Sequence, residues 1–274
     1  MGERSFFVDP GTIKEGRADL SGPVAHQIRN VLRLRPGDLV ELLDNSGFIQ
    51  VARLTTVSKE GLSATVVERR RSDAEPSVEL VLYQALLKGQ KMELVLQKGT
   101  EIGVNRFVPI LSERCISRPS AQDLDRKLER WRTIVREAAE QSGRAVLPEL
   151  SSMESLEEAC GRATAEGLVL MAWEEERAVG IGSVLREAGF GTDGEMRRRG
   201  DGERVLPSPR PGTEARPRVS LLVGPEGGFS PAEAEMARRA GARVVSLGPR
   251  ILRAETAAFV SATLVLCETG DMGG

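Results

Sequence analysis

The sequence predicts an α/β protein with two domains, a small β-rich domain over residues 1–72 and a larger domain with a parallel sheet over residues 73–274. Up to residue 72, short strand-like runs follow one another with turn signals between them. Beyond that point, apolar runs alternate with segments of helical spacing. This alternation is typical of a parallel sheet with helices on both faces.

The composition favours an ordinary globular protein. Apolar residues make up 40% of the chain and charged residues 28%, with a net charge of −2. No apolar run approaches the roughly 20 residues that a membrane span needs. The three cysteines, Cys115, Cys160 and Cys267, lie far apart, which argues against a disulfide framework or a CxxC metal site. We therefore expect a reducing, cytoplasmic location and no membrane partner.

The strand-like runs of the first domain are RSFFV, DLVELLD, GFIQVARLTTV and GLSATVVE, and their regular spacing predicts a small barrel or sandwich. One helix interrupts them, VAHQIRNVLRL at residues 24–34. At 100° per residue its apolar stripe contains Val24, Ile28, Val31 and Leu32.

In the second domain we expect strands at residues 78–86, 105–111, 168–173, 219–223 and 243–247. A long amphipathic helix follows the second of these strands, with Leu124, Leu128, Trp131, Val135 and Ala138 on one stripe. Residues 189–218 are rich in Gly, Arg, Pro and Glu and nearly free of apolar residues. They cannot bury enough surface to offset the cost of ordering, so we expect a mobile loop there; a basic RNA-contacting tail is the alternative.

The stretch LVGPEGGFSP, residues 222–231, is the main candidate for a ligand site. Ser230 and Glu233 form a capping box with Pro231 at the first helical position, so a strand, a glycine loop and a helix follow one another. The loop lacks the lysine and the spacing of phosphate-binding motifs, and Glu226 would compete with a phosphate. A neutral or cationic ligand suits it better, although a tight turn without a ligand would explain the glycines too.

A second such turn occurs in LGPRILRAETAAFVSATLVL, residues 247–266. Again a Gly-Pro pair follows a strand, and Glu255 and Thr256 open an apolar helix. Because ligands of open α/β sheets bind beyond the carboxyl ends of the strands, the two turns would form adjacent walls of one pocket.

These two motifs, in this order, resemble those of the 16S rRNA uracil-N3 methyltransferase family, which belongs to the SPOUT methyltransferases. HQIRNVLRLRPGD (26–38), KGQKMELVLQKGTEIGV (88–104), SERC (112–115) and EQSGR (140–144) extend the resemblance over nearly the whole chain. Two features depart from the family pattern. Residues 189–218 are longer than expected, and Ala254 stands where a larger, often hydroxylated residue is expected.

The resemblance implies a PUA-like β-barrel over residues 1–72 that binds RNA. It also implies a SPOUT domain over residues 73–274 whose sheet contains a deep trefoil knot. The knot loops of such domains bind S-adenosylmethionine. This cofactor is a sulfonium cation joined to adenosine, and it contains no phosphate. The resemblance assigns the cofactor wall to Met171, Ala172, Leu222, Gly224, Glu226, Gly228, Leu247, Gly248, Leu252, Thr256 and Ala257, with Glu255 beside them.

The implied reaction is methyl transfer to N3 of a uridine in 16S rRNA of the assembled small subunit, at uridine 1498 in ribosomal numbering. N3 lies on the Watson–Crick edge, so the base has to be unpaired or flipped out. Neutral uracil carries a proton on N3, which calls for a base or for a positive charge that stabilises the uracil anion. Arg253 is our candidate for that charge, and Glu255 for positioning or proton removal. A SPOUT methyltransferase with another target, such as a ribose 2′-OH, and a non-catalytic RNA-binding assembly module are the alternatives.

Candidate RNA contacts come from both domains. On the helix at residues 24–34, His26, Arg29 and Arg33 share a face, with Arg35 just beyond it; a solvated helix face is the alternative. Arg114 and Arg144 lie in motifs of the family, where they suit the rim of the pocket; an ion pair between Glu113 and Arg144 is equally compatible with the sequence. His26 is the single histidine, which excludes a histidine-based metal cluster. The resemblance also implies a homodimer.

Overall fold

A computed structural model describes residues 4–59, 61–190 and 216–273, and the chain divides into two compact units. Residues 1–75 and 135–147 form the first unit, and residues 76–134 and 148–274 form the second. The first unit thus includes a short segment, 135–147, that lies far beyond the boundary expected at residue 72. Residues 191–215, on which the expected mobile loop largely falls, lie outside the described residues.

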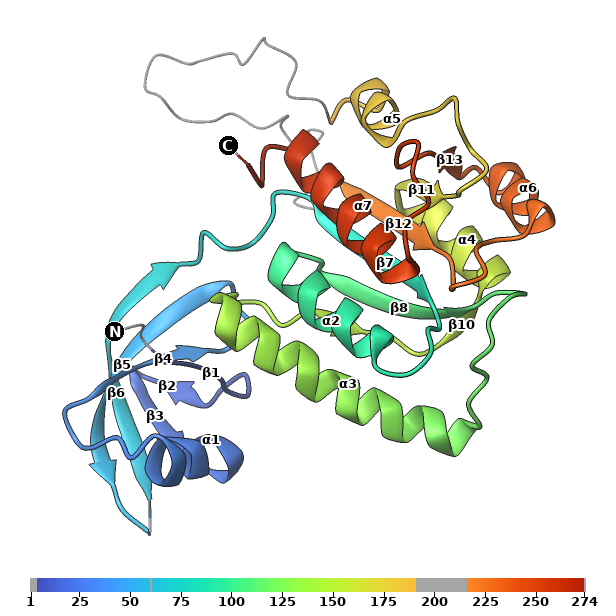
Figure 1. The fold of residues 1–274 in the computed structure, drawn as a ribbon. Coiled ribbons are helices and arrows are strands. Elements are labelled where there is room, and N and C mark those ends of the chain that lie inside the picture. The colour runs from blue at the N-terminus through green and yellow to red at the C-terminus, as the bar shows by residue number, and fades with distance from the viewer. Residues whose placement is uncertain (1–3, 60, 191–215, 274) are drawn as a thin grey trace, which may run out of the picture. The chain divides into compact units, whose positions relative to one another are not determined.

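The first unit is built on a six-stranded sheet with the order β1-β4-β5-β6-β3-β2 (Figure 1). Its strands pair antiparallel except for β1 and β4, which are parallel. Two register shifts interrupt the long β5–β6 pair, at Val51/Ala52 and Leu54/Thr56. Such bulges bend a sheet, so that one face encloses a core. The strands are β1 (Ser5–Phe7), β2 (Ile13–Lys14), β3 (Arg17–Leu20), β4 (Leu39–Leu43), β5 (Phe48–Val57) and β6 (Leu62–Arg71).

The helix expected at residues 24–34 is shorter and wound differently from the prediction. Helix α1 spans Gly22–His26, and a π-helical turn, Gln27–Val31, continues it. Because a π turn has more residues per turn than an α-helix, the 100° spacing fails beyond His26. Ile28 is fully buried as predicted, but Val31 is 63% exposed, so its place on the apolar stripe was wrong.

The segment 135–147 completes the first unit with a second small core. Ala139 and Ala145 are fully buried against Phe7, Leu43 and Val51. The N–H of Phe7 donates to the carboxylate of Glu140 at 3.0 Å. Burial raises the pKa of Glu140 above its ordinary value, although this hydrogen bond opposes the shift.

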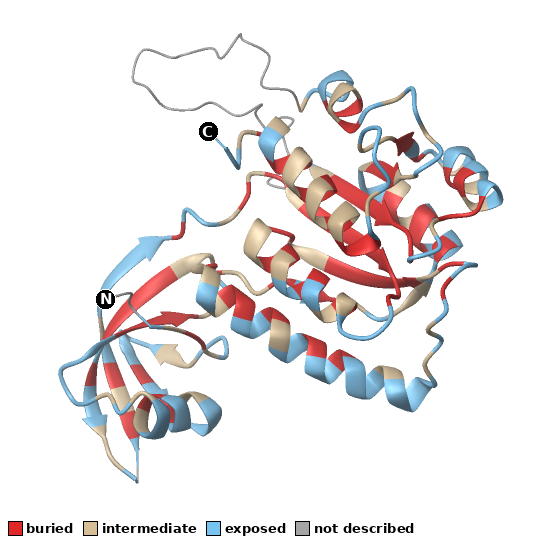
Figure 2. Ribbon diagram, in the orientation of Figure 1, coloured by how far each residue is buried: buried red, intermediate tan, exposed pale blue. Residues whose placement is uncertain are grey.

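The second unit contains a seven-stranded parallel sheet with the order β10-β8-β7-β12-β11-β13, and β9 also pairs with β8. The central strands β7 and β12 are buried along almost their whole length (Figure 2). All five predicted strands are present, with ends that differ by up to two residues. The strands are β7 (Glu79–Ala85), β8 (Arg106–Leu111), β9 (Glu149–Leu150), β10 (Glu154–Ser155), β11 (Leu168–Ala172), β12 (Arg218–Val223) and β13 (Arg243–Val245).

Two groups of helices pack on this sheet. Helix α7 contacts β7, β12, α2 and α5, whereas α4 contacts β8, β11 and α6. The capping box predicted at the start of α6 is present, with Ser230 accepting from the N–H of Glu233. No helix within the described ranges is long and apolar enough to cross a membrane. The helices of this unit are α2 (Lys91–Ile102), α4 (Leu156–Glu166), α5 (Ile181–Glu187), α6 (Pro231–Arg239) and α7 (Ala254–Glu268). Helix α3 (Ala121–Ser142) begins in this unit, and its residues from 135 on belong to the first unit.

Candidate functional site: a cavity between two glycine loops

A cavity of about 390 Å³ opens at the carboxyl ends of three neighbouring strands of the second unit. Its walls are the segment after β11, the loop at residues 223–229 after β12, and the loop at residues 246–254 after β13. Lys91, the first residue of α2, closes one side. The strand order places β11 between β12 and β13, so two loops from separate parts of the sequence face the same space.

Glycine is required in the first loop because the backbone folds closely on itself. A Cβ atom at Gly224 would lie 3.2 Å from the carbonyl carbon of Gly228 and from the nitrogen of Phe229. Gly228 has φ +68°, in the left-handed region, and a Cβ there would lie 2.0 Å from Oε1 of Glu174. The two glycines therefore allow the tight turn and keep the cavity open.

Side chains from neighbouring segments hold the carbonyls of this loop. Gln84 is fully buried at the end of β7, and its Nε2 lies 3.3 Å from the oxygen of Gly224. Trp173 donates from Nε1 to the oxygen of Phe229 at 3.1 Å. Arg114 donates from Nη1 to the oxygen of Gly227 at 2.9 Å. The loop is thus held from three elements of the second unit.

Two carboxylates and an ammonium group meet at the side of the cavity. Nζ of Lys91 lies 3.3 Å from Oε1 of Glu226 and 3.6 Å from Oε2 of Glu255. Glu226 also accepts from the N–H of Lys88 at 3.1 Å. Glu255 is 9% exposed, and its Oε2 accepts no hydrogen bond from the part of the chain that the structure describes. Lys91 thus links Glu226 of the loop at residues 223–229 to Glu255 in the first turn of α7.

The charge state of Glu226 reflects these contacts. Burial of the carboxyl acts to raise its pKa, but the backbone N–H groups of Glu226 and Lys88 and the Lys91 ammonium outweigh that effect. The pKa of Glu226 is consequently below its ordinary value, so the side chain is anionic at neutral pH.

Most of the residues expected to bind the cofactor border this cavity. Those at the cavity are Ala172, Gly224, Glu226, Gly228, Leu247, Gly248, Leu252 and Ala257, together with the catalytic candidate Arg253. Arg253 is exposed, and its guanidinium makes no hydrogen bond or ion pair with the described part of the chain. Met171 and Leu222 are fully buried in their strands and do not line it. Glu255 and Thr256 lie in the first turn of α7, next to lining residues.

Several residues that shape the cavity were missed by sequence reasoning. Lys91 was not singled out for this site, and Trp173 and Gln84 fell within the strands expected at residues 168–173 and 78–86. Their signal in the sequence is only their position, at or just beyond the carboxyl end of a predicted strand, where side chains face a ligand site. The remaining lining residues not expected are Glu174, Val223, Pro225, Gly227, Phe229, Ser246, Arg250, Ile251 and Ala254.

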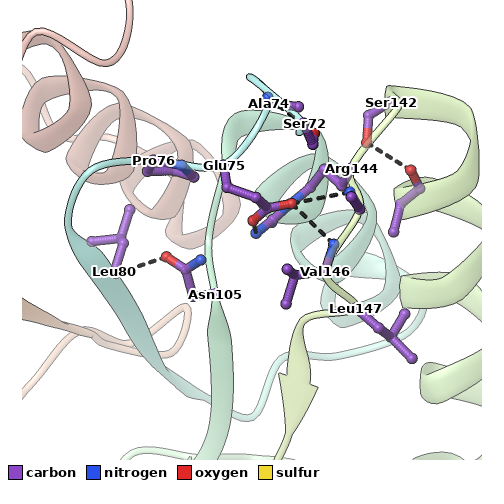
Figure 3. A network of polar contacts seen from close by, with 12 residues as sticks. Ser72, Ala74, Glu75, Pro76, Leu80, Asn105, Ser142, Arg144, Val146 and Leu147 are labelled. Carbon is purple, nitrogen blue, oxygen red and sulfur yellow. Dashed lines mark hydrogen bonds and ion pairs between the residues drawn. The ribbon is translucent and has the colours of Figure 1, made fainter. Parts of the chain in front are cut away.

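Arg144 does not have the role expected for it. Its side chain is 2% exposed and pairs with Glu75, Nη2 to Oε2, at 2.8 Å (Figure 3). Oε1 of Glu75 also accepts from the N–H groups of Ala145 and Val146, at 3.2 and 3.1 Å. This buried network belongs to the first unit, and it removes Arg144 from contact with RNA phosphates. Arg144 does form an ion pair, but with Glu75 and not with Glu113, the partner considered from the sequence.

The basic residues of the first unit differ in their availability. His26, Arg33 and Arg35 are exposed, whereas Arg29 is half-buried and donates from Nη1 to the oxygen of Ser58 at 2.8 Å. Arg33 has φ +54° just beyond the π-helical turn, so it no longer shares a helical face with His26. The expected triad on one helix face is therefore not formed as predicted.

Comparisons with known proteins agree with this architecture. A family of RNA methyltransferase domains matches residues 74–193 and 199–266, and a family of RNA methyltransferase PUA domains matches residues 20–67. Ribosomal RNA small subunit methyltransferase E of Synechocystis is 32% identical over 93% of this chain and 75% of its own length. The protein of that name from Bacillus subtilis is 29% identical over 93% of this chain and 91% of its own length.

A crystal structure shows the same likeness. Ribosomal RNA small subunit methyltransferase E from Neisseria gonorrhoeae, bound to S-adenosyl methionine, superposes with a TM-score of 0.78. It is 30% identical and covers 97% of this chain and 98% of its own. With its PUA domain, its parallel sheet and its two glycine loops, the chain belongs to the RNA methyltransferase family that includes the ribosomal RNA small subunit methyltransferases E.

Proposed function

We propose that this protein transfers the methyl group of S-adenosylmethionine to N3 of a uridine in 16S rRNA, at uridine 1498 of the assembled small subunit. The observation that carries the proposal is the cavity between the two glycine loops. Its lining includes residues of both loops that the family resemblance assigns to the cofactor. The names of the relatives and the cofactor bound to the gonococcal protein support the same reaction.

The residues present fit S-adenosylmethionine. Its sulfonium is cationic, and the cavity has two carboxylates at its side but no phosphate-binding lysine motif. The carbonyls of Gly224, Gly227 and Phe229 are held by side chains of neighbouring elements, so the loop is organised before the cofactor enters. A preorganised polar wall of this kind binds a ligand without the cost of ordering the loop.

The chain's own residues supply positioning and charge for the reaction. Bound S-adenosylmethionine supplies an electrophilic methyl group, which N3 takes while the electron pair of the broken bond stays on sulfur. Arg253, exposed at the cavity and without a partner among the described residues, is placed to stabilise the uracil anion. Glu255 has an oxygen without a hydrogen bond and is our candidate to orient the base or accept the N3 proton.

Three further features belong to this proposal. The strand order, with β12 inserted between β7 and β11, supports the trefoil knot that the family resemblance implies. Helix α7 leaves Phe259 and Leu264 partly exposed, and Ile251 beside it is 78% exposed; this apolar surface supports a homodimer. A cytoplasmic location follows from a ribosomal substrate. The elution mass of the pure protein, measured by light scattering, tests the dimer.

The test of the reaction uses methyl-labelled S-adenosylmethionine with small ribosomal subunits that lack the modification, beside naked 16S rRNA. Nucleoside mass spectrometry identifies the modified base. We expect 3-methyluridine on the subunits. Label on a ribose would favour a different target of the same fold. Cofactor binding without transfer to either RNA would refute the target, and no cofactor binding would favour a non-catalytic RNA-binding module.

A further inference from the structure

A second cleft of the methyltransferase unit is lined mainly by cations. It has a volume of about 420 Å³ and lies between the start of α2 and the first turns of α3. Its cations are Arg118, Arg126, Lys127 and Arg130, and its carboxylates are Glu93 and Asp123. Ser117 and Pro119 complete the lining. We call it the basic cleft.

The helical spacing of α3 creates the basic cleft. Asp123, Arg126, Lys127 and Arg130 follow one another at intervals of three, one and three residues, which places them along one side of the helix. Leu128 and Trp131 point into the core instead. The side chains of Arg126 and Arg130 are 68% and 62% exposed, so their charges face solvent.

The ion pairs inside the basic cleft do not neutralise all of its cations. Arg126 pairs with Asp123 at 3.1 Å, and Arg130 pairs with Glu93 at 2.8 Å. Among the described residues, Arg118 donates only to the backbone oxygen of Glu113, at 3.4 Å. Lys127 makes no hydrogen bond or ion pair with the residues the structure describes. Two cations are therefore not balanced by a carboxylate, and even paired arginines keep donors for phosphate oxygens.

Two short stretches of chain connect residues of the cofactor cavity with residues of the basic cleft. In the first turn of α2, Lys91 lines the cavity and Glu93, two residues on, lines the cleft. In the segment between β8 and α3, Arg114 contacts the glycine loop, and Ser117 and Arg118 line the cleft. The start of α3 accordingly lies on the side of the sheet where β8 ends (Figure 1).

We propose that the basic cleft binds the phosphate backbone of the substrate RNA next to the nucleotide whose base enters the cofactor cavity. This inference rests on the proposed function. A base that leaves its stack carries its flanking phosphates to the mouth of the active site, so cations are needed there. The cleft would position the strand without reading its sequence, which is what phosphate contacts do.

The experiment compares two double variants of the full-length protein. Arg126→Gln/Lys127→Gln removes two cations of the basic cleft. Arg132→Gln/Arg239→Gln removes two exposed cations elsewhere, one of them on the same helix, and is the matched control. Binding to unmodified small subunits is measured by filter retention at several salt concentrations, and the affinity for S-adenosylmethionine is measured by calorimetry.

We expect the cleft variant to bind subunits about 10-fold more weakly near physiological salt, with a slope of log affinity against log salt reduced by about 1.5, the loss of two phosphate contacts. Its cofactor affinity should be unchanged, because neither residue lines the cavity. Equal losses in the control variant would reduce the effect to net charge and overturn the proposal. Weaker binding with an unchanged salt slope would indicate a ribosomal protein as the partner and overturn it too.

The wild-type protein separates this inference from the proposed function. If the wild type does not methylate subunits, the proposed function fails and the substrate assigned to the cleft falls with it. If the wild type methylates subunits and the cleft variant binds and methylates them equally well, the cleft proposal alone is wrong.

Discussion

The two loops that border the cofactor cavity are supported very differently. The loop at residues 223–229 is held by Gln84, Trp173 and Arg114, and its glutamate is tied to Lys88 and Lys91. The loop at residues 246–254 has few such side-chain contacts. The N–H of Gly248 donates to the hydroxyl of Ser246, and Arg177 donates to the oxygen of Pro249 at 3.3 Å. Ile251 at its tip is 78% exposed.

From this difference we infer that the two loops have different roles. A loop that side chains of neighbouring segments hold in place provides a preorganised wall for the cofactor, since little order has to be gained on binding. A loop with exposed apolar and cationic residues provides a surface that another molecule covers. Changes in the first loop should therefore affect cofactor affinity most, and changes in the second loop should affect it least.

Gly224→Ala should have the largest effect. Its Cβ would lie 3.2 Å from backbone atoms of Gly228 and Phe229 in the same loop, so the loop backbone would have to shift. We expect binding of S-adenosylmethionine to weaken by about 100-fold, which corresponds to about 2.7 kcal/mol. Calorimetric titration measures it. Gly161→Ala is the control, because a Cβ there meets no atom within 4 Å and Gly161 lies inside α4. An unchanged affinity in Gly224→Ala would show that the loop is not a fixed wall.

Lys91→Met should have the next largest effect. It removes the ammonium between Glu226 and Glu255 and leaves two carboxylates facing each other at the cavity. We expect about 10-fold weaker cofactor binding, with part of it restored in Lys91→Met/Glu226→Gln, where one of the two charges is gone. Lys98→Met on the same helix is the control, since Lys98 pairs with Glu101 and does not line the cavity. A double variant as weak as the single one would contradict this charge-balance argument.

The pH dependence of stability should reveal the contacts that stabilise the ionised carboxylate of Glu226. Its pKa is lowered in the folded protein, so its contribution to stability is present above the ordinary value of 4.5 and is lost as pH falls through the lowered value. We expect the wild type to melt at a higher temperature than Glu226→Gln near pH 6. The difference should shrink as the pH falls below 4.5. A difference in melting temperature that grows on acidification would show that the sign is wrong.

Arg177→Ala should have the smallest effect on the cofactor. It removes one hydrogen bond, to Pro249, from the less supported loop. We expect a change of less than about 3-fold in the affinity for S-adenosylmethionine. A typical hydrogen bond contributes only about 0.5–1.5 kcal/mol net, and at this exposed position water replaces the lost partner. A loss comparable to that of Gly224→Ala would erase the distinction between the two loops.

Much of the second unit was predictable from sequence because its signals are local. Buried parallel strands are short apolar runs, and the capping box at Ser230 and Glu233 is complete within four residues. The first unit was harder. The π-helical turn after His26 changes the period of the side chains, and nothing in the residues 27–31 announces it. Val31 was consequently placed in the core although it is 63% exposed.

The candidate site shows the same limit. Its two glycine loops were predicted because each has its own motif, and the family resemblance implied S-adenosylmethionine as the cofactor. Lys91, Gln84 and Trp173 were missed because each acts through a partner far along the chain. Arg144 was assigned to RNA because it is a charged residue within a family motif. In the structure its side chain is buried and paired with Glu75, so it is not accessible to RNA.

By itself, the sequence determined the succession of strands and helices, the two tight loops and the family. These depend on residues near one another, where local sterics and periodicity decide. Tertiary structure decided which charged side chains are exposed to solvent and which are paired within the protein. Strand β12 pairs with β7 although more than 130 residues separate them, and that pairing brings Glu226 to Lys91. Long-range strand order is set by the packing of the whole sheet, and no local pattern encodes it.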